Sequence, residues 1–124
     1  MMKRFFLLAL AAVACGPSIT LTTERATYHP GEDVTLTLKN TSLASIGHNL
    51  CSTKLIDADG GSIRDTPDGS FCPLILIQLN GGMSATSVRN LPASLDAGAY
   101  HYRTGIEVDG DQVDIVSNAF DVAP

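Results

Sequence analysis

Four residues of this 124-residue chain are candidates for one shared metal site, namely His48, Cys51, Cys72 and His101. His48 and Cys51 are spaced like metal ligands, and two thiolates with one or two imidazoles would suit zinc or copper. Cys51 and Cys72 are also spaced as an ordinary disulfide would be. The choice depends on the compartment, because thiols persist in reducing surroundings and oxidise to disulfides in exported proteins.

Residues 1–14 have the three-part layout of an export signal. A basic start at Met1–Arg4 precedes an apolar run, Phe5–Val13, and small residues stand directly before Cys15. The run is too short for a membrane-spanning helix, which needs about 20 residues. We therefore expect a cleaved signal helix over 1–14 and a mature chain that works outside the cytoplasm.

Export favours a disulfide between Cys51 and Cys72 over a metal site. The bridge would close a loop of about 20 residues and stabilise the fold by roughly 3 kcal/mol in the chain-entropy treatment. We accordingly expect no cofactor, and His48 and His101 remain weaker candidates for a zinc or copper site. His101 stands between two tyrosines of an expected strand, so alternation directs it to the outer face.

The segment Ala12-Val13-Ala14-Cys15 resembles the lipobox of bacterial lipoproteins. That resemblance implies that Cys15 becomes the first mature residue and carries acyl chains, with residues 15–18 as a lipid-attachment cysteine and short linker. Cysteine parity agrees, since lipid on Cys15 leaves Cys51 and Cys72 as a pair. Gly16 after the cysteine implies, in that family, an outer-membrane location facing the periplasm or the surface. An ordinary secretory cleavage site would also be cut before Cys15.

Charge excludes one class of partner. The chain has 8 basic and 13 acidic residues and a net charge of −5, and removal of Lys3 and Arg4 leaves 6 against 13, or −7. Nucleic acid is therefore not expected as a partner. An acidic surface does not favour anionic headgroups either, so lipid rather than charge would hold the chain at a bilayer. Hydrophobic residues at 44% argue against disorder.

Residues 19–124 read as one domain of strands, because apolar residues alternate with Thr and charged residues at period two. Asp109-Gly110 is the strongest hairpin signal, and Asp57–Gly61 is a second turn. Short strands with regular turns predict a sandwich or barrel. The expected strands are Ile19–Thr22, Val34–Lys39, Lys54–Ile56, Pro73–Leu79, Ser84–Asn90, Gly98–Val108 and Gln112–Val122.

Two further expectations concern the apolar run Pro73–Leu79. Its almost wholly apolar sequence predicts a central strand buried in the core. Asn80-Gly81-Gly82 then predicts a hairpin into Ser84–Asn90.

The approach Leu95-Asp96-Ala97-Gly98-Ala99-Tyr100 resembles the start of strand F in immunoglobulin-like domains, where a tyrosine hydroxyl bonds back to upstream main chain. We assign that structural role to Tyr100, with Gly98 and Leu95 beside it. The mature region resembles bacterial exported immunoglobulin-like domains and, loosely, the BsuPI proteinase-inhibitor domain. The resemblance implies an immunoglobulin-like sandwich of about seven antiparallel strands. Its motifs are Tyr28-x-Pro30-Gly31-Glu32, Leu36–Ser42, Asn49-Leu50-Cys51, Leu91-Pro92, Gly98-x-Tyr100 and Ser117-Asn118-Ala119-Phe120-x-Val122.

No motif of a catalytic nucleophile, metalloprotease or phosphate loop occurs, so we expect no enzyme. Asp109 and Asp111 are explained by turn propensity, with a weak calcium site as the alternative. Asn40-Thr41-Ser42 matches a glycosylation sequon. The sequence predicts a membrane-anchored envelope module that binds another protein or a cell-wall component. The alternatives are a proteinase inhibitor of BsuPI type and a zinc- or copper-binding envelope protein.

Overall fold

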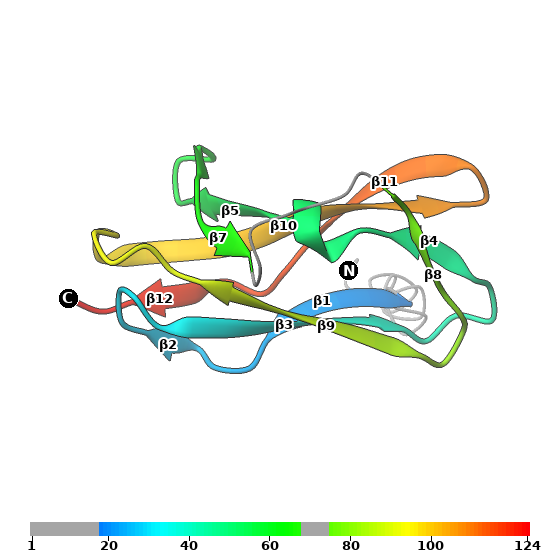
Figure 1. The fold of residues 1–124 in the computed structure, drawn as a ribbon, viewed down its shortest axis with the longest axis horizontal. Coiled ribbons are helices and arrows are strands. Elements are labelled where there is room, and N and C mark those ends of the chain that lie inside the picture. Colours follow the sequence, from blue (N-terminus) through cyan, green and yellow to red (C-terminus); the bar gives the residue numbers. More distant parts are fainter. Residues whose placement is uncertain (1–17, 68–74) are drawn as a thin grey trace, which may run out of the picture.

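The computed structural model describes residues 18–67 and 75–124, and almost every regular element in them is a β-strand (Figure 1). The described part of the chain has twelve strand segments and one short 3-10 helix, η2 (Leu50–Ser52). Six of the twelve strands have only two or three residues, which is too short for an alternation pattern to reveal. The sequence therefore predicted about seven strands. The strands are β1 (Ile19–Thr23), β2 (Thr27–Tyr28), β3 (Asp33–Asn40), β4 (Ile46–His48), β5 (Lys54–Asp57), β6 (Ser62–Ile63), β7 (Thr66–Pro67), β8 (Ile77–Leu79), β9 (Ser84–Asn90), β10 (Gly98–Val108), β11 (Asp111–Val116) and β12 (Phe120–Val122).

The strands form two sheets that face each other as a sandwich. The first sheet has the order β1-β3-β9-β7, and the second has the order β2-β12-β10-β4-β8, with β5 and β11 also paired to β10. In Figure 1 β3 and β9 lie in one layer, and β10 lies with β4 and β5 in the other. This order matches strands A-B-E-D against C-F-G of an immunoglobulin-like domain. The predicted fold class is therefore confirmed.

The core lies between the two sheets and follows from alternation along the long strands. In β3 the side chains of Val34, Leu36 and Leu38 are fully buried, while Asp33 and Lys39 are exposed. Beside the first half of β10 the aromatic rings gather around Phe120, whose ring centroid lies 5.4 Å from that of Tyr28 and 5.6 Å from that of Tyr102. The other buried members are Leu21, Ile46, Leu50, Leu55, Leu79, Leu91, Leu95, Tyr100, Ile106 and Val122.

The turn signals give mixed results. Asp109-Gly110 closes the β10–β11 hairpin as predicted, with Val108 paired to Asp111 and with φ of 51° and 85° at the two turn residues. Such positive φ values at both positions are what Asp-Gly supplies in a type I′ turn. Asp57 caps the β5–β6 turn, because its Oδ1 accepts hydrogen bonds from the main-chain N–H groups of Asp59 and Gly61.

The apolar segment before Asn80 differs from its prediction. Of its described residues, 75–79, only Ile77–Leu79 forms a strand, and this is the last strand of the second sheet in the described chain, paired with β4. Ile75, Leu76 and Ile77 are 50–56% exposed, so the prediction of a central core strand was wrong. Asn80-Gly81-Gly82 makes no hairpin, since β8 pairs with β4 and β9 pairs with β3. The turn instead carries the chain from one sheet to the other.

Tyr100 has the geometry of a tyrosine corner. Its hydroxyl donates a hydrogen bond of 2.7 Å to the main-chain oxygen of Asp96, four residues upstream. Leu95 is buried nearby, and Gly98 has a φ of 154°, which side chains rarely adopt. The three residues fix the entry of β10, the strand on which most of the second sheet is assembled.

Several predictions fall outside the described residues. The signal segment 1–14, the lipid-attachment position Cys15, and Cys72 with Pro73 belong to them. Lipidation and the Cys51–Cys72 disulfide therefore stay predictions. Within residues 18–67 and 75–124, no helix has the length and apolar character needed to cross a membrane.

Candidate functional site

The outer face of the second sheet carries a hollow over the middle of β10. Along β10 the side chains of Tyr100, Tyr102, Thr104 and Ile106 point into the core, so the alternate residues face outward. The hollow lies over this outward row and has a volume of about 410 Å³. Its lining comes from β5, β10, β11, the η2 segment and the start of the β8 segment, namely Asn49, Ser52, Lys54, Ile75, Leu76, Arg103, Thr104, Gly105, Gln112 and Asp114.

Gly105 lines the hollow in the middle of β10 and leaves room there for the end of the Gln112 side chain. It stands in the interior of an 11-residue strand and has no positive φ, so the backbone conformation does not require glycine there. A Cβ at this position would lie 2.8 Å from Nε2 of Gln112 and 3.7 Å from Oδ1 of Asp114. Glycine inside a strand weakens it and often marks the close approach of another group. Gly105 therefore lets the side chain of Gln112 lie close against the outer face of β10.

A second glycine, Gly47 of β4, lets the side chain of Leu76 pack closely against the sheet and form the apolar wall of the hollow. A Cβ at Gly47 would meet Cδ1 of Leu76 at 3.4 Å and Cβ of Glu107 at 3.6 Å. Leu76 therefore lies across the outer face of the sheet at this point. Beyond it a second hollow of about 280 Å³ is lined by Ser45, Ile46, Gly47, Leu76, Ile77, Gln78 and Glu107. Leu76 thus separates two adjoining hollows.

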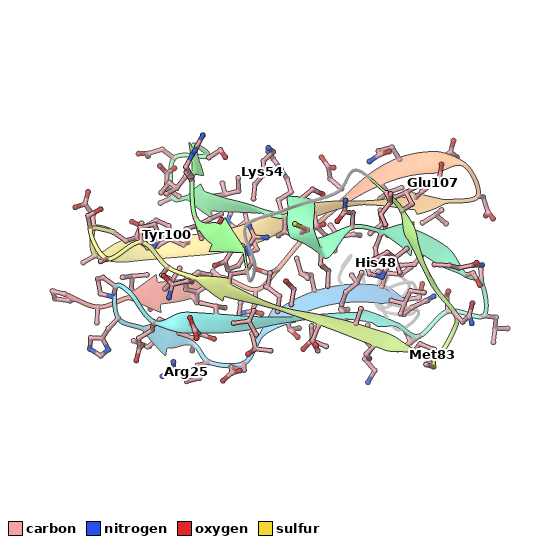
Figure 2. All side chains as sticks on the ribbon, viewed as in Figure 1. Arg25, His48, Lys54, Met83, Tyr100 and Glu107 are labelled. Carbon is pink, nitrogen blue, oxygen red and sulfur yellow. The ribbon has the colours of Figure 1, made fainter. Side chains whose placement is uncertain are left out.

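The opposite wall of the first hollow carries two cations. Lys54 and Arg103 are directly paired across β5 and β10, where side chains share one face. Figure 2 shows Lys54 on the side of its sheet that faces away from the other layer. In the part of the chain that the structure describes, neither cation has a carboxylate oxygen within 4.0 Å. Asp114 lines the hollow on the β11 side, opposite Gly105.

The η2 segment at the rim is fixed by the buried Arg89 of β9. Its Nη1 donates to the main-chain oxygens of Leu50 and Cys51, and its Nη2 donates to that of Thr53. Nε and Nη2 also bind both carboxylate oxygens of Asp65, at 3.1 and 2.8 Å. Arg89 therefore ties the first sheet to the segment that presents Asn49 and Ser52 to the hollow.

Two of the predicted metal candidates, His48 and His101, lie far apart, and Cys72 is outside the described residues. His48 is paired with Ile106 and points into the core, as Figure 2 shows, whereas His101 belongs to the outward row. The two positions are also about 16 Å apart along β10. They cannot bind one ion together. Cys51 lies half-buried in η2, and no three His, Cys, Asp or Glu side chains of the described residues gather as metal ligands.

His48 is instead a buried base. Its Nδ1 has no hydrogen-bond partner, and desolvation by burial lowers the pKa of the imidazole from its ordinary value. The unfolded chain therefore binds a proton at a higher pH than the folded chain does. The free energy of unfolding is therefore highest, as far as His48 is concerned, above the unfolded pKa of about 6.5, where the imidazole is neutral in both states. It decreases as the pH falls from there toward the folded pKa.

Acidification should accordingly weaken the fold through His48. We expect the free energy of unfolding to fall between pH 7.5 and pH 5.5, by less than the limit of about 1.4 kcal/mol per pH unit for one proton. His48→Leu removes the titrating group and should flatten this part of the profile. Urea unfolding of both proteins at several pH values measures the difference. Equal pH slopes for the two proteins would contradict the assignment.

The hollow was not predicted from the sequence. The pattern identified β10 correctly but gave no role to the glycine within it. The usable signal is that Gly47 and Gly105 occur in strand-forming stretches without an adjoining turn residue. Because Leu76 comes from a segment that was predicted to lie in the core, its position over Gly47 could not be inferred.

Comparison with known proteins supports the fold alone. No protein-family model and no curated protein sequence matches the chain. Among solved structures, the chaperone DraB of E. coli is similar with a TM-score of 0.57 and 16% identity, over 86% of this chain and 55% of that one. The chain thus spans about half the length of this chaperone. The yjhA protein of Bacillus subtilis has a TM-score of 0.48 and 16% identity, over 86% and 92% of the two chains. The fimbrial subunit MyfA of Yersinia enterocolitica has a TM-score of 0.47 and 13% identity, over 87% of this chain and 100% of that one.

Proposed function

We propose that this chain is a non-enzymatic binding module of the bacterial cell envelope, exported and anchored through an acylated Cys15. The edge of its second sheet at Ile75–Ile77 binds another protein. The observation that carries this proposal is the run of three exposed apolar side chains beside two adjoining hollows. Contiguous exposed apolar residues on a globular domain are typical of interaction sites.

The position of this run in the sheet adds a second argument. In the described residues β8 is the terminal strand on its side of the second sheet, with β4 as its partner. A terminal strand offers unpaired main-chain groups, and extended segments of partner proteins commonly add to such strands. Main-chain pairing would supply affinity, and the side chains of Leu76 and Gln78 on the outer face would supply selectivity.

The export signal and the lipobox-like segment support the location. Two or more acyl chains give stable anchoring, whereas a single chain binds only marginally. Similarity of fold to the chaperone DraB is compatible with a protein-binding module, although one fold carries many functions.

Photocross-linking in the host cell tests the proposal. A photoreactive residue at position 76 should give a defined cross-linked product, identified by mass spectrometry. The same residue at position 39, an exposed site on the other sheet, is the control and should not give it. Absence of a product from position 76, or the same products from both positions, would overturn the binding role. A protease as the captured protein would select the inhibitor form of the function.

The anchor is tested in the same preparation. The cross-linked product should sediment with membranes, and Cys15→Ser should move the chain to the soluble fraction. A chain that stays with membranes after this substitution would contradict anchoring through Cys15.

A further inference from the structure

We propose that the hollow over Gly105 recognises an acidic side chain of the partner protein, held by Lys54 and Arg103 while a neighbouring apolar side chain packs on Ile75 and Leu76. This inference rests on the proposed binding function and names the chemistry of the segment that is bound. The occupant is an extended peptide segment in which an acidic residue has an apolar neighbour.

The first argument is the charge arrangement. Like charges placed directly opposite each other on two strands destabilise a sheet. Lys54 and Arg103 are such a pair, in a chain whose acidic residues outnumber its basic ones by 13 to 8. The ion pairs of the described residues join Arg25 and His29 to Glu32 and Arg89 to Asp65, and none of them includes Lys54 or Arg103. A carboxylate from outside the chain would relieve the repulsion.

The second argument is the shape of the site. Gly105 follows Arg103 by two residues, so it stands next to it in the outward row of β10. It adds no side chain of its own, and the atom nearest to a Cβ placed there is Nε2 at the flexible end of Gln112, 2.8 Å away. A carboxylate that approaches the two cations can therefore be accompanied by chain or side chain lying over Gly105. The apolar side chains of Ile75 and Leu76 bound the same hollow, which suits an apolar neighbour of the acidic residue.

The third argument is the polarity within the hollow. Asp114 and Gln112 line it on the β11 side, and Asp114 would repel an anion that bound there. The acidic group is thus directed to the Lys54 side, while hydrogen-bond donors of the ligand suit Asp114. This asymmetry sets one orientation for the bound segment.

Fluorescence anisotropy with labelled peptides tests the inference. The probes are heptapeptides of alternating Val and Thr with Glu, Gln or Lys at the centre, titrated with the purified full chain. The Glu peptide should bind about tenfold more tightly than the Gln peptide, because charge-assisted hydrogen bonds are the stronger kind. Its affinity should fall as salt is raised.

Three variants locate the effect. Lys54→Glu with Arg103→Glu should remove the preference for Glu, whereas Lys39→Glu, an exposed charge reversal on the other sheet, should keep it. Gly105→Val fills the hollow and should weaken all three peptides. Its fold should hold, since the group that it meets is the mobile end of Gln112, and thermal unfolding checks this.

The outcomes separate this inference from the proposed function. Equal affinity for the Glu and Gln peptides, or an equal loss from Lys39→Glu, would overturn the acidic-residue assignment. If cross-linking from position 76 then persists, the binding role stands without it. If the preference for the Glu peptide and the cross-link from position 76 are both absent, the binding role itself fails. Binding of phosphatidylglycerol vesicles that depends on Lys54 and Arg103 would replace the peptide with a lipid headgroup.

Discussion

Replacing Arg89 with methionine should lower the free energy of unfolding by about 3–5 kcal/mol, as expected when one partner of a buried ion pair is removed. The side chains of Arg89 and Asp65 are each 3% exposed, so water cannot take the place of the missing guanidinium. The carboxylate of Asp65 would remain buried without its cation. We expect this to be among the most destabilising single substitutions in the chain.

The hydrogen bonds of Arg89 explain the size of this effect. The guanidinium has five N–H donors, and the structure pairs them with two carboxylate oxygens and three main-chain oxygens. Methionine fills a similar space but donates none of these bonds. Lysine would keep the charge yet cannot bind a carboxylate through two parallel hydrogen bonds. Arg89→Lys should therefore also destabilise the fold.

Urea unfolding of Arg89→Met against Arg64→Met measures the effect. Arg64 is an exposed residue beside Asp65 in sequence, and its replacement should change stability by less than about 0.5 kcal/mol. Because Arg89 holds η2 at the rim of the hollow, the conservative Arg89→Lys variant should also bind the Glu peptide more weakly. Equal stability of the Arg89→Met and Arg64→Met variants would show that the buried pair contributes little.

The sequence predicted those parts of the fold that depend on local patterns. Alternation in β3 identified the buried residues Val34, Leu36 and Leu38, and Asp109-Gly110 located the hairpin, because period and turn chemistry are encoded within a few residues. The approach Leu95–Tyr100 identified the sandwich type. In each case the information lies inside one segment of the chain.

The candidate site depends on contacts between distant segments, and local patterns do not contain them. An apolar run such as Ile75–Leu79 has the same sequence whether it is buried centrally or lies at a sheet edge as an exposed surface. From its sequence Arg89 is an ordinary polar residue of a half-exposed strand, and only the folded structure places η2 and Asp65 beside it. The pairing of Lys54 with Arg103 likewise follows from register, which sequence alone does not give.

Replacing Asn40 with aspartate should lower the free energy of unfolding by about 3 kcal/mol at pH 7, since a buried polar group then loses its partners and becomes charged. Asn40 is fully buried at the end of β3. Its Nδ2 donates to the main-chain oxygens of Ala44 and Leu79, at 2.8 and 3.0 Å. Aspartate at this position would place a carboxylate oxygen, which cannot donate, against the main-chain oxygens of Ala44 and Leu79. Asn40 of the sequon Asn40-Thr41-Ser42 therefore has a structural role in the folded chain. Its amide is buried, so a glycan could not be attached there in the folded state.

The same residue joins three segments near the proposed binding face. Its Oδ1 accepts from the main-chain N–H and the hydroxyl of Ser42, and its main-chain oxygen accepts from Gly82 in the turn that follows β8. Asn40 thus secures the end of β8, whose other end continues into the exposed apolar run. We expect Asn40→Asp to weaken cross-linking from position 76 as well as to destabilise the fold.

The pH dependence of Asn40→Asp distinguishes this explanation from general damage. Burial and the two facing oxygens would raise the pKa of the new carboxyl group in the folded chain above its unfolded value. The folded variant then binds the extra proton more tightly, so its deficit should shrink as the pH falls toward about 4. Asn80→Asp is the matched control, because Asn80 is exposed and its Oδ1, which accepts from Ser45, survives the change. Urea unfolding at pH 4.5 and 7.5 gives both comparisons. A deficit independent of pH, or equal to that of Asn80→Asp, would show that the buried amide does not join these segments.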